Sequence, residues 1–198
     1  MTGIGIIGII GVIGALLGLL IVVGIIVAVI YNGLVSARVD TDNAWAQIDV
    51  QLKRRHDLIP NLVETVKGYA SHESGTLEAV IAARTRAVAV PSGGANAAQA
   101  SQAEGELTQA LGRLFAVAEA YPDLKADSSF GQLQEELATT ENKIGFSRQH
   151  YNDSVGNYEE RRMSFPVNII AGMFGFAKRE YFKLADGDAA REAPKVSF

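Results

Sequence analysis

The sequence predicts an all-α protein, in which an N-terminal transmembrane helix precedes an antiparallel helical bundle with long helices. Three observations support this fold class. The first 30 residues contain no charged side chain. Beyond them, apolar residues recur every three or four positions, which is the spacing of a packed helix. No stretch alternates apolar and polar residues for long enough to form a sheet.

The N-terminal apolar run extends from Ile4 to Ile30 and is interrupted only by glycines. At ~1.5 Å rise per residue it spans ~40 Å, which exceeds the ~30 Å hydrocarbon core of a bilayer. A cleaved signal peptide is the alternative, because VSA at 35–37 resembles a weak cleavage site. A signal peptide has a basic n-region and an apolar core of roughly 7–15 residues, and this run has neither. We therefore assign residues 1–32 to a membrane anchor and 33–198 to the bundle.

All charged residues follow the anchor, and the formal net charge is −4. A nucleic-acid-binding surface would be basic on one face, so no nucleic-acid partner is expected. The absence of cysteine excludes disulfides and thiolate metal sites. Basic residues, beginning with Arg38, lie only on the C-terminal side of the anchor. The positive-inside tendency therefore favours a single pass with the N-terminus outside and the bundle in the cytoplasm.

The first bundle helix is expected to be long, because its apolar seam starts at Trp45 and continues to Ala87. Three polar residues interrupt that seam and indicate a polar strip in or beside it: Arg55, Glu73 and Arg84.

Two further helices follow. A loop is predicted from Pro91 through the small-residue stretch at 95–101. The second helix has its seam at 107–121 and ends before Pro122. The third starts with Ser128 or Ser129 as its N-cap and ends at the Phe–Pro pair at 165–166.

The C-terminal segment 165–182 is markedly apolar and has two interpretations. It forms a short helix that closes the bundle, or it is a second segment that contacts membrane or another subunit. The second interpretation rests on four aromatic residues near Lys178 and Arg179: Phe174, Phe176, Tyr181 and Phe182. The final EAPKVSF, 192–198, is expected to be an extended strap docked on the bundle.

Pro60 predicts a bend, since it lies within the helical stretch RRHDLIPNLVETV. In one interpretation Asp57 caps a restarted helix and Pro60 occupies its first turn, where a missing N–H has little cost. In the other, the helix is continuous and kinks about the His56 carbonyl.

Polar residues surround this bend and recur on the predicted third helix. They form either a fixed polar network that specifies helix register or a groove that contacts a partner protein or peptide. The candidates are Arg54, Arg55, Asp57, Asn61, Lys67, Glu141, Asn142, Arg148 and Asn152.

No catalytic, metal-binding or cofactor-binding residues are predicted. His72–Glu73 lacks the second histidine of an H-E-x-x-H zinc motif. SGGANAA and GMFGFAK lack the spacing of a phosphate-binding loop. No nucleophile-elbow pattern indicates a catalytic triad. The chain is therefore expected to be no enzyme and to need no cofactor.

Small residues lie on more than one face of the anchor helix and would let helix backbones approach closely. This pattern predicts a homo-oligomer larger than a dimer within membrane lipids. The residues are Gly8, Gly11, Gly14, Ala15, Gly18, Gly24 and Ala28.

Five motifs in order resemble the LemA family: NAWAQIDVQLKRRHDLIPNLVETVKGY (43–69), EAYPDLKA (119–126), ENKIGFSRQHYNDSVGNY (141–158), FPVNIIAGMFGF (165–176) and the ending PKVSF. The resemblance implies a bacterial cytoplasmic-membrane protein with one N-terminal membrane helix, its short N-terminus outside and a long helical bundle in the cytoplasm. Glu159 replaces the asparagine usual in that family. The resemblance transfers no catalytic residue.

Relatives connected with bacterial membrane organelles imply membrane organisation or remodelling. The first hypothesis is accordingly a self-assembling, membrane-anchored scaffold. The alternative is a membrane-tethered module that senses or binds a partner protein or peptide through the polar patch of its bundle.

Overall fold

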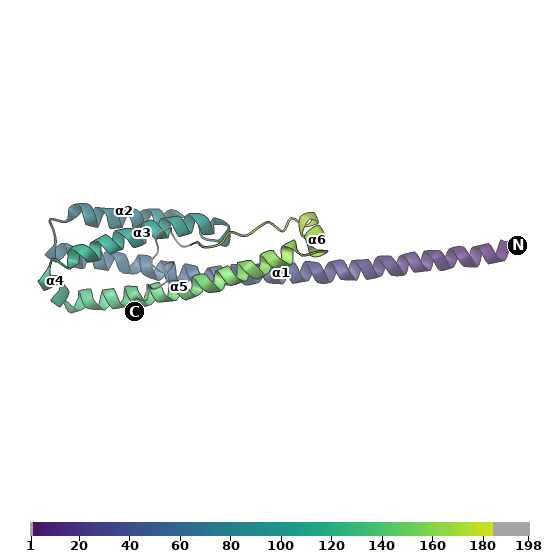
Figure 1. Ribbon diagram of the computed structural model, residues 1–198, viewed down its shortest axis with the longest axis horizontal. Coiled ribbons are helices and arrows are strands. Elements are labelled where there is room, and N and C mark those ends of the chain that lie inside the picture. The colour runs from purple at the N-terminus through teal and green to yellow at the C-terminus, as the bar shows by residue number, and fades with distance from the viewer. Residues whose placement is uncertain (1, 184–198) are drawn as a thin grey trace, which may run out of the picture. The chain divides into compact units, whose positions relative to one another are not determined.

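A computed structural model of the protein describes the backbone of residues 2–183 and the side chains of residues 11–183. That part of the chain contains helices and connecting segments but no strand, which confirms the all-α prediction (Figure 1). Its contacts separate two units. The smaller consists of Met1–Asp40 with Gly156–Lys178, and the larger of Thr41–Val155 with the chain from Arg179 on. The predicted strap at 192–198 lies outside the described residues.

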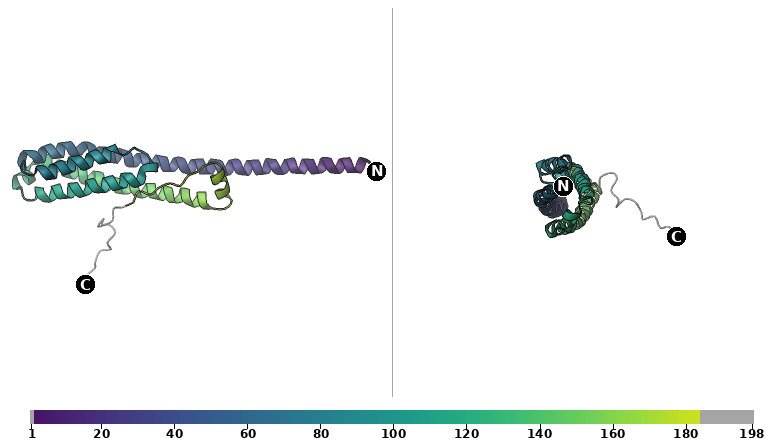
Figure 2. Two further views of the ribbon diagram at one scale, coloured as in Figure 1. Left: turned by 90° about the horizontal axis from the view of Figure 1, so that it is seen from above. Right: turned by 90° about the vertical axis from the view of Figure 1, so that its left-hand side faces the viewer.

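The larger unit is an antiparallel bundle of helices. It contains the C-terminal part of α1 (Thr2–Tyr69), then α2 (Ser74–Ala89), α3 (Ala97–Ala118) and the first part of α5 (Ser128–Met163). These four helices lie side by side, and each runs opposite to the one before it (Figures 1 and 2). The short helices η1 (Gly94–Asn96) and α4 (Pro122–Ala126) occupy two of the connections.

The bundle core is built from the predicted seams. Buried aliphatic and aromatic residues of all four helices pack together in it; they include Ile59, Leu62, Val66, Leu77, Val80, Leu107, Leu114, Phe130 and Leu137. A second cluster surrounds Trp45, whose ring meets Tyr151 edge-on at a centroid distance of 5.1 Å. Burial of these side chains provides the main favourable term for the bundle.

The predicted single seam from Trp45 to Ala87 is wrong, because the chain turns at 70–73 and forms two helices. Tyr69 ends α1, and its side chain is 43% exposed rather than in the seam. The turn is closed by backbone hydrogen bonds from Ala70 N to Val66 O and from Glu73 N to Ala70 O. Gly68 and the SHESG run at 71–75 were the overlooked turn signal, since serine and glycine favour turns.

The predicted loop at 91–101 is too long, because α3 already begins at Ala97. Alanine is the best helix former, and Ala97 and Ala100 are buried in the cluster around Trp45. The start of α5 also differs from the prediction. Asp127, rather than a serine, accepts hydrogen bonds from the backbone N–H groups of Ser129 and Phe130, and this holds the pKa of Asp127 below its ordinary value.

The smaller unit contains residues of α1 up to 40, the end of α5 and α6 (Val167–Met173). Its core combines residues of all three helices and of the segment after α6: Leu34, Ala37, Tyr158, Ala171 and Phe176. The buried Tyr158 hydroxyl donates to the Ala177 carbonyl at 2.8 Å. A short C-terminal helix is thus present, as the first interpretation of 165–182 expected, and within this unit it packs beside α1.

Among the described residues, α1 is the one helix long and apolar enough to cross a membrane. Its most apolar window has a mean hydropathy of 3.2, and no part of that window is buried within the chain. The observed structure thus has the long N-terminal apolar helix that the sequence predicts.

Pro60 lies inside a continuous helix, so the alternative of a helix restarted at Asp57 is wrong. Proline has no N–H to donate to the carbonyl four residues earlier, and here that carbonyl belongs to His56. Arg84 of α2 takes the place of the missing donor, with its Nε 2.7 Å from the His56 oxygen. A helix defect in α1 is therefore compensated by a side chain of its neighbour.

This arrangement predicts coupling between Pro60 and Arg84. Arg84→Met should lower the free energy of unfolding by about 1–3 kcal/mol, because it leaves a half-buried carbonyl without a donor. In a Pro60→Ala background the restored N–H can serve His56, so the same substitution should cost less than about 1 kcal/mol. Urea unfolding of the four chains gives the coupling.

Arg86→Met is the matched control for this cycle, since Arg86 forms an exposed ion pair with Glu106. This substitution should change the free energy of unfolding by under about 1 kcal/mol in either background. If Arg84→Met lowers the free energy of unfolding equally with and without Pro60, the bond to His56 does not compensate for the proline.

Candidate functional site

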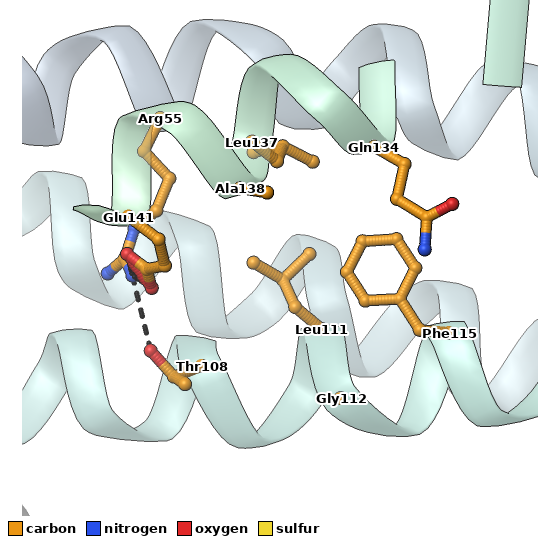
Figure 3. Close-up of a pocket in the computed structure, with 9 residues that line it drawn as sticks. All are labelled: Arg55, Thr108, Leu111, Gly112, Phe115, Gln134, Leu137, Ala138 and Glu141. Atoms are coloured by element: carbon orange, nitrogen blue, oxygen red, sulfur yellow. Dashed lines mark hydrogen bonds and ion pairs between the residues drawn. The ribbon is translucent and has the colours of Figure 1, made fainter. Parts of the chain in front are cut away.

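The most unusual group in the bundle is the guanidinium of Arg55, whose side chain is only 3% exposed. Its Nη2 donates to a Glu104 carboxylate oxygen from α3, and its Nη1 lies 2.5 Å from the Glu141 carboxylate of α5. Nη1 also lies 3.2 Å from the Thr108 hydroxyl, as Figure 3 shows. One charge on α1 thus binds side chains of two other helices.

His56, the next residue on α1, contacts the same carboxylate group. Its Nε2 lies 2.8 Å from Glu104 Oε1, and its side chain is 12% exposed. Burial, followed by the positive charges of Arg55 and Arg84, lowers the pKa of His56 to about 4. At neutral pH the imidazole is therefore neutral and donates its Nε2 hydrogen to Glu104.

The cluster is a largely buried ion-pair network. Burial lowers the pKa of Arg55, and its pairing with Glu141 opposes that effect. Loss of Arg55 would leave the buried carboxylate of Glu104 without its cation, and breaking a buried pair in this way costs about 3–5 kcal/mol. A substitution at Arg55 therefore tests folding before it tests any binding.

An apolar groove of about 290 Å³ adjoins the cluster (Figure 3). Arg55 and Glu141 lie at one end of the drawn side chains, while Phe115 and Gln134 lie at the other. Glu141 is 43% exposed, so its carboxylate is accessible from solvent. The remaining lining residues are Thr108, Leu111, Gly112, Leu137 and Ala138.

A second cavity of about 260 Å³ is lined by the other members of the cluster, His56 and Glu104, and by Trp45. The indole Nε1 of Trp45 is buried and has no hydrogen-bond partner among the described residues. The same holds for the Arg55 Nε. Each cavity is therefore lined by a residue with an unused donor.

Of the predicted polar set, the structure brings Arg55 and Glu141 together in this cluster. Arg54 instead lies 3.7 Å from Glu136 in an exposed ion pair. Asn152 binds the chain end, because it exchanges hydrogen bonds with the backbone N–H and carbonyl of Phe182. The other members lie outside the cluster, Arg148 half-buried and the rest exposed: Asp57, Asn61, Lys67, Asn142 and Arg148.

Sequence reasoning missed Glu104 and Thr108. Glu104 lies three residues before Leu107, the first residue of the predicted second seam, and so continues that seam backwards. An acidic residue at a buried position requires a partner, which was the available signal. It was overlooked because 95–101 was interpreted as a loop and the seam was started after it.

The four aromatic residues of the C-terminal segment separate into two groups. Phe176 and Phe182 are buried in the cores of the smaller and larger units, respectively. Phe174 is 52% exposed and Tyr181 37% exposed. The structure thus leaves only the second pair available to an outside contact.

Among residues 11–183, the small residues of the N-terminal apolar stretch of α1 face open space. A Cβ placed on Gly11, Gly14, Gly18 or Gly24 would meet nothing within 4 Å, and Ala15 and Ala28 are exposed. Gly8 lies among the residues whose side-chain surroundings are not described. Within residues 11–183, no group of three or more histidine, aspartate or glutamate side chains is placed to hold a metal ion.

The model of the LemA family matches residues 44–198. Magnetosome proteins MamQ 2 and MamQ 1 of Paramagnetospirillum magneticum are each 27% identical to this chain over 175 residues, which is 77% of this chain and 64% of theirs. Protein LemA of Metamycoplasma hominis is 23% identical over 140 residues, 71% of this chain and 63% of its own. The chain thus matches just under two thirds of the length of these curated relatives. Their names denote no enzymatic reaction.

The lowered pKa of His56 predicts a pH-dependent stability. Between pH 6.5 and about 4 the unfolded chain binds a proton at this residue that the folded chain does not. The contribution of His56 is therefore complete above pH 6.5 and falls by up to about 3 kcal/mol as the pH decreases to 4. The measurement is the difference in urea-unfolding free energy between the wild type and His56→Gln, which keeps a donor for Glu104. A difference that instead grows in favour of the wild type at low pH would mean that His56 is protonated against Glu104.

Proposed function

We propose that this chain, which belongs to the LemA family, is a membrane-anchored, non-catalytic scaffold that assembles with copies of itself and organises or remodels membrane. In this proposal α1 crosses the bacterial cytoplasmic membrane once, with its N-terminus outside and the bundle in the cytoplasm. The partners are membrane lipids and further copies of the chain.

The observation that carries the proposal is the unburied apolar stretch of α1. Its leucines, isoleucines and valines between residues 12 and 26 are each about half exposed or more. Leaving one such side chain in water instead of burying it costs about 1.5–3 kcal/mol. The stretch therefore needs a nonaqueous environment, and its length and composition suit a bilayer.

Self-assembly is supported by the faces of the same helix that consist of small residues and are open. Nothing in the described part of the chain packs against Gly11, Gly14, Gly18 or Gly24, so close backbone approach there would come from another helix. Small residues at four-residue spacing permit such an approach in lipid. The name of MamQ associates that relative with the magnetosome, and this supports a role for the present chain in organising membrane.

Filling one face of small residues on α1 should reduce the size of the assembly. Gly14→Leu with Gly18→Leu adds bulk where the single chain has open space, so it should disturb contacts between chains and leave the bundle folded. We expect light scattering of the full-length protein in mild detergent to show a mass at least halved. Leu16→Phe with Leu20→Phe adds bulk on the opposite face of the helix and is the control. An unchanged mass for the glycine variant would remove helix packing from the proposal.

A second candidate function is recognition of a partner peptide or protein. The observation that favours it is the groove beside Arg55 and Glu141, which joins an apolar wall to an accessible carboxylate. Clefts with this combination are common binding sites. Loss of one buried charge would leave its partner unpaired and disturb the fold, so a test of binding must alter the wall of the groove.

Ala138 and Thr139 provide a matched pair for this test. Both are exposed on α5, but only Ala138 lines the groove. Ala138→Trp should fill the groove and weaken at least tenfold the binding of peptides selected on the immobilised full-length protein, whereas Thr139→Trp should not. Equal melting temperatures by circular dichroism would show that the fold is intact. If both variants bind the peptides equally well, the groove is not the recognition site.

A further inference from the structure

Beside the anchor, the smaller unit has a second exposed apolar surface. Ile169 and Met173 lie four residues apart on α6 and are 55% and 76% exposed, and Phe165, in the turn before the helix, is 81% exposed. Side chains at this spacing share one face of a helix. The opposite face of α6 is also apolar, and there Ile170 and Ala171 are buried. The short helix α6 thus has apolar residues on both its inner and its outer side.

This outer face is continuous with the end of the membrane-spanning stretch. Phe174, which directly follows α6, is half exposed and meets Tyr31 at a ring-centroid distance of 5.0 Å. Tyr31 is the first residue after the apolar run of α1. Figure 1 shows α6 beside α1. Aromatic residues at such a position lie at the level of the lipid headgroups.

The charges near this face indicate how it would bind. Residues 156–178 contain Glu159, Glu160, Arg161, Arg162 and Lys178, and two of these charges neutralise each other in the ion pair of Glu159 with Arg162. Little net charge remains to attract anionic headgroups. Binding to a membrane would therefore come from burial of apolar side chains, and it should depend little on the charge of the lipid.

We infer that the outer face of α6, formed by Ile169 and Met173, inserts shallowly, together with the flanking Phe165 and Phe174, into the leaflet from which α1 emerges. This inference rests on the proposed membrane anchoring. Apolar helix faces of this kind enter the boundary between headgroups and acyl chains, ~5–10 Å deep. Insertion into one leaflet expands that leaflet alone, which gives the anchored chain a direct means of curving the membrane.

The test uses the full-length protein reconstituted into vesicles of zwitterionic phosphatidylcholine whose acyl chains carry bromine near the headgroup. Ile169→Trp and, separately, Met173→Trp place a fluorophore on the outer face, where both residues are exposed and the substitution should not affect folding. The native Trp45 is buried in the bundle and contributes the same background to every sample. Phe146→Trp is the control, because Phe146 is 75% exposed and belongs to the bundle unit.

We expect bromine to quench more than half of the added emission of both α6 variants and less than a tenth of that of the Phe146 variant. Vesicles containing anionic lipid should give the same result. Water-like, unquenched emission from the α6 variants would overturn the inference. Blue-shifted emission without quenching would also overturn it, since it would show that a second copy covers the face instead of lipid.

Flotation after a carbonate wash separates this inference from the proposed function. If the protein stays with the vesicles while its α6 tryptophan remains unquenched, the membrane anchor is upheld and only the insertion of α6 is refuted. Protein released by the wash refutes the membrane anchor, and the inference about α6 falls with it.

Discussion

One buried cation imposes a constraint on the packing of three helices of the bundle. The Arg55 guanidinium lies among three helices and cannot be solvated by bulk water, so carboxylates from α3 and α5 must reach it. The attraction between Arg55 and Glu104 acts where both side chains are buried and the effective dielectric constant is low. A shift in helix register would separate Arg55 from both carboxylates. Apolar seams alone permit several registers. In the register observed here, Arg55 meets both carboxylates.

A second arginine acts on the same part of α1 for a different reason. Pro60 deprives the His56 carbonyl of its helical donor, and Arg84 supplies that donor from α2. Arg55 and Arg84 together therefore connect α3, α5 and α2 to adjacent turns of α1. The His56 side chain, held neutral between them, donates to Glu104. Arg55 and Arg84, which interrupt the predicted seam, are thus residues through which neighbouring helices contact α1.

In the smaller unit apolar surface is the main feature. Its interior is closed by Leu34, Tyr158 and Phe176, yet much of its apolar surface faces outward, on α1 before Tyr31 and on α6. In water such surface would be unfavourable, whereas a bilayer would cover it. The proposed scaffold thus combines a unit that needs lipid with a bundle whose buried charges determine its own packing.

The sequence by itself determined the fold class, the long N-terminal apolar helix and the family motifs, because hydrophobic run length and three-to-four periodicity are local properties of the chain. It also indicated Arg55 and Arg84 as seam interruptions, and Pro60 as a defect. It did not reveal that the seam turns at 70–73, that α3 starts at Ala97, or that Glu104 is a partner of Arg55. The turn and the early start of α3 do have local signals, in the serine–glycine run at 71–75 and in the alanines from Ala97 on. Only the tertiary structure decided the pairing of Arg55 with Glu104, because it joins two helices through residues 49 positions apart in the chain.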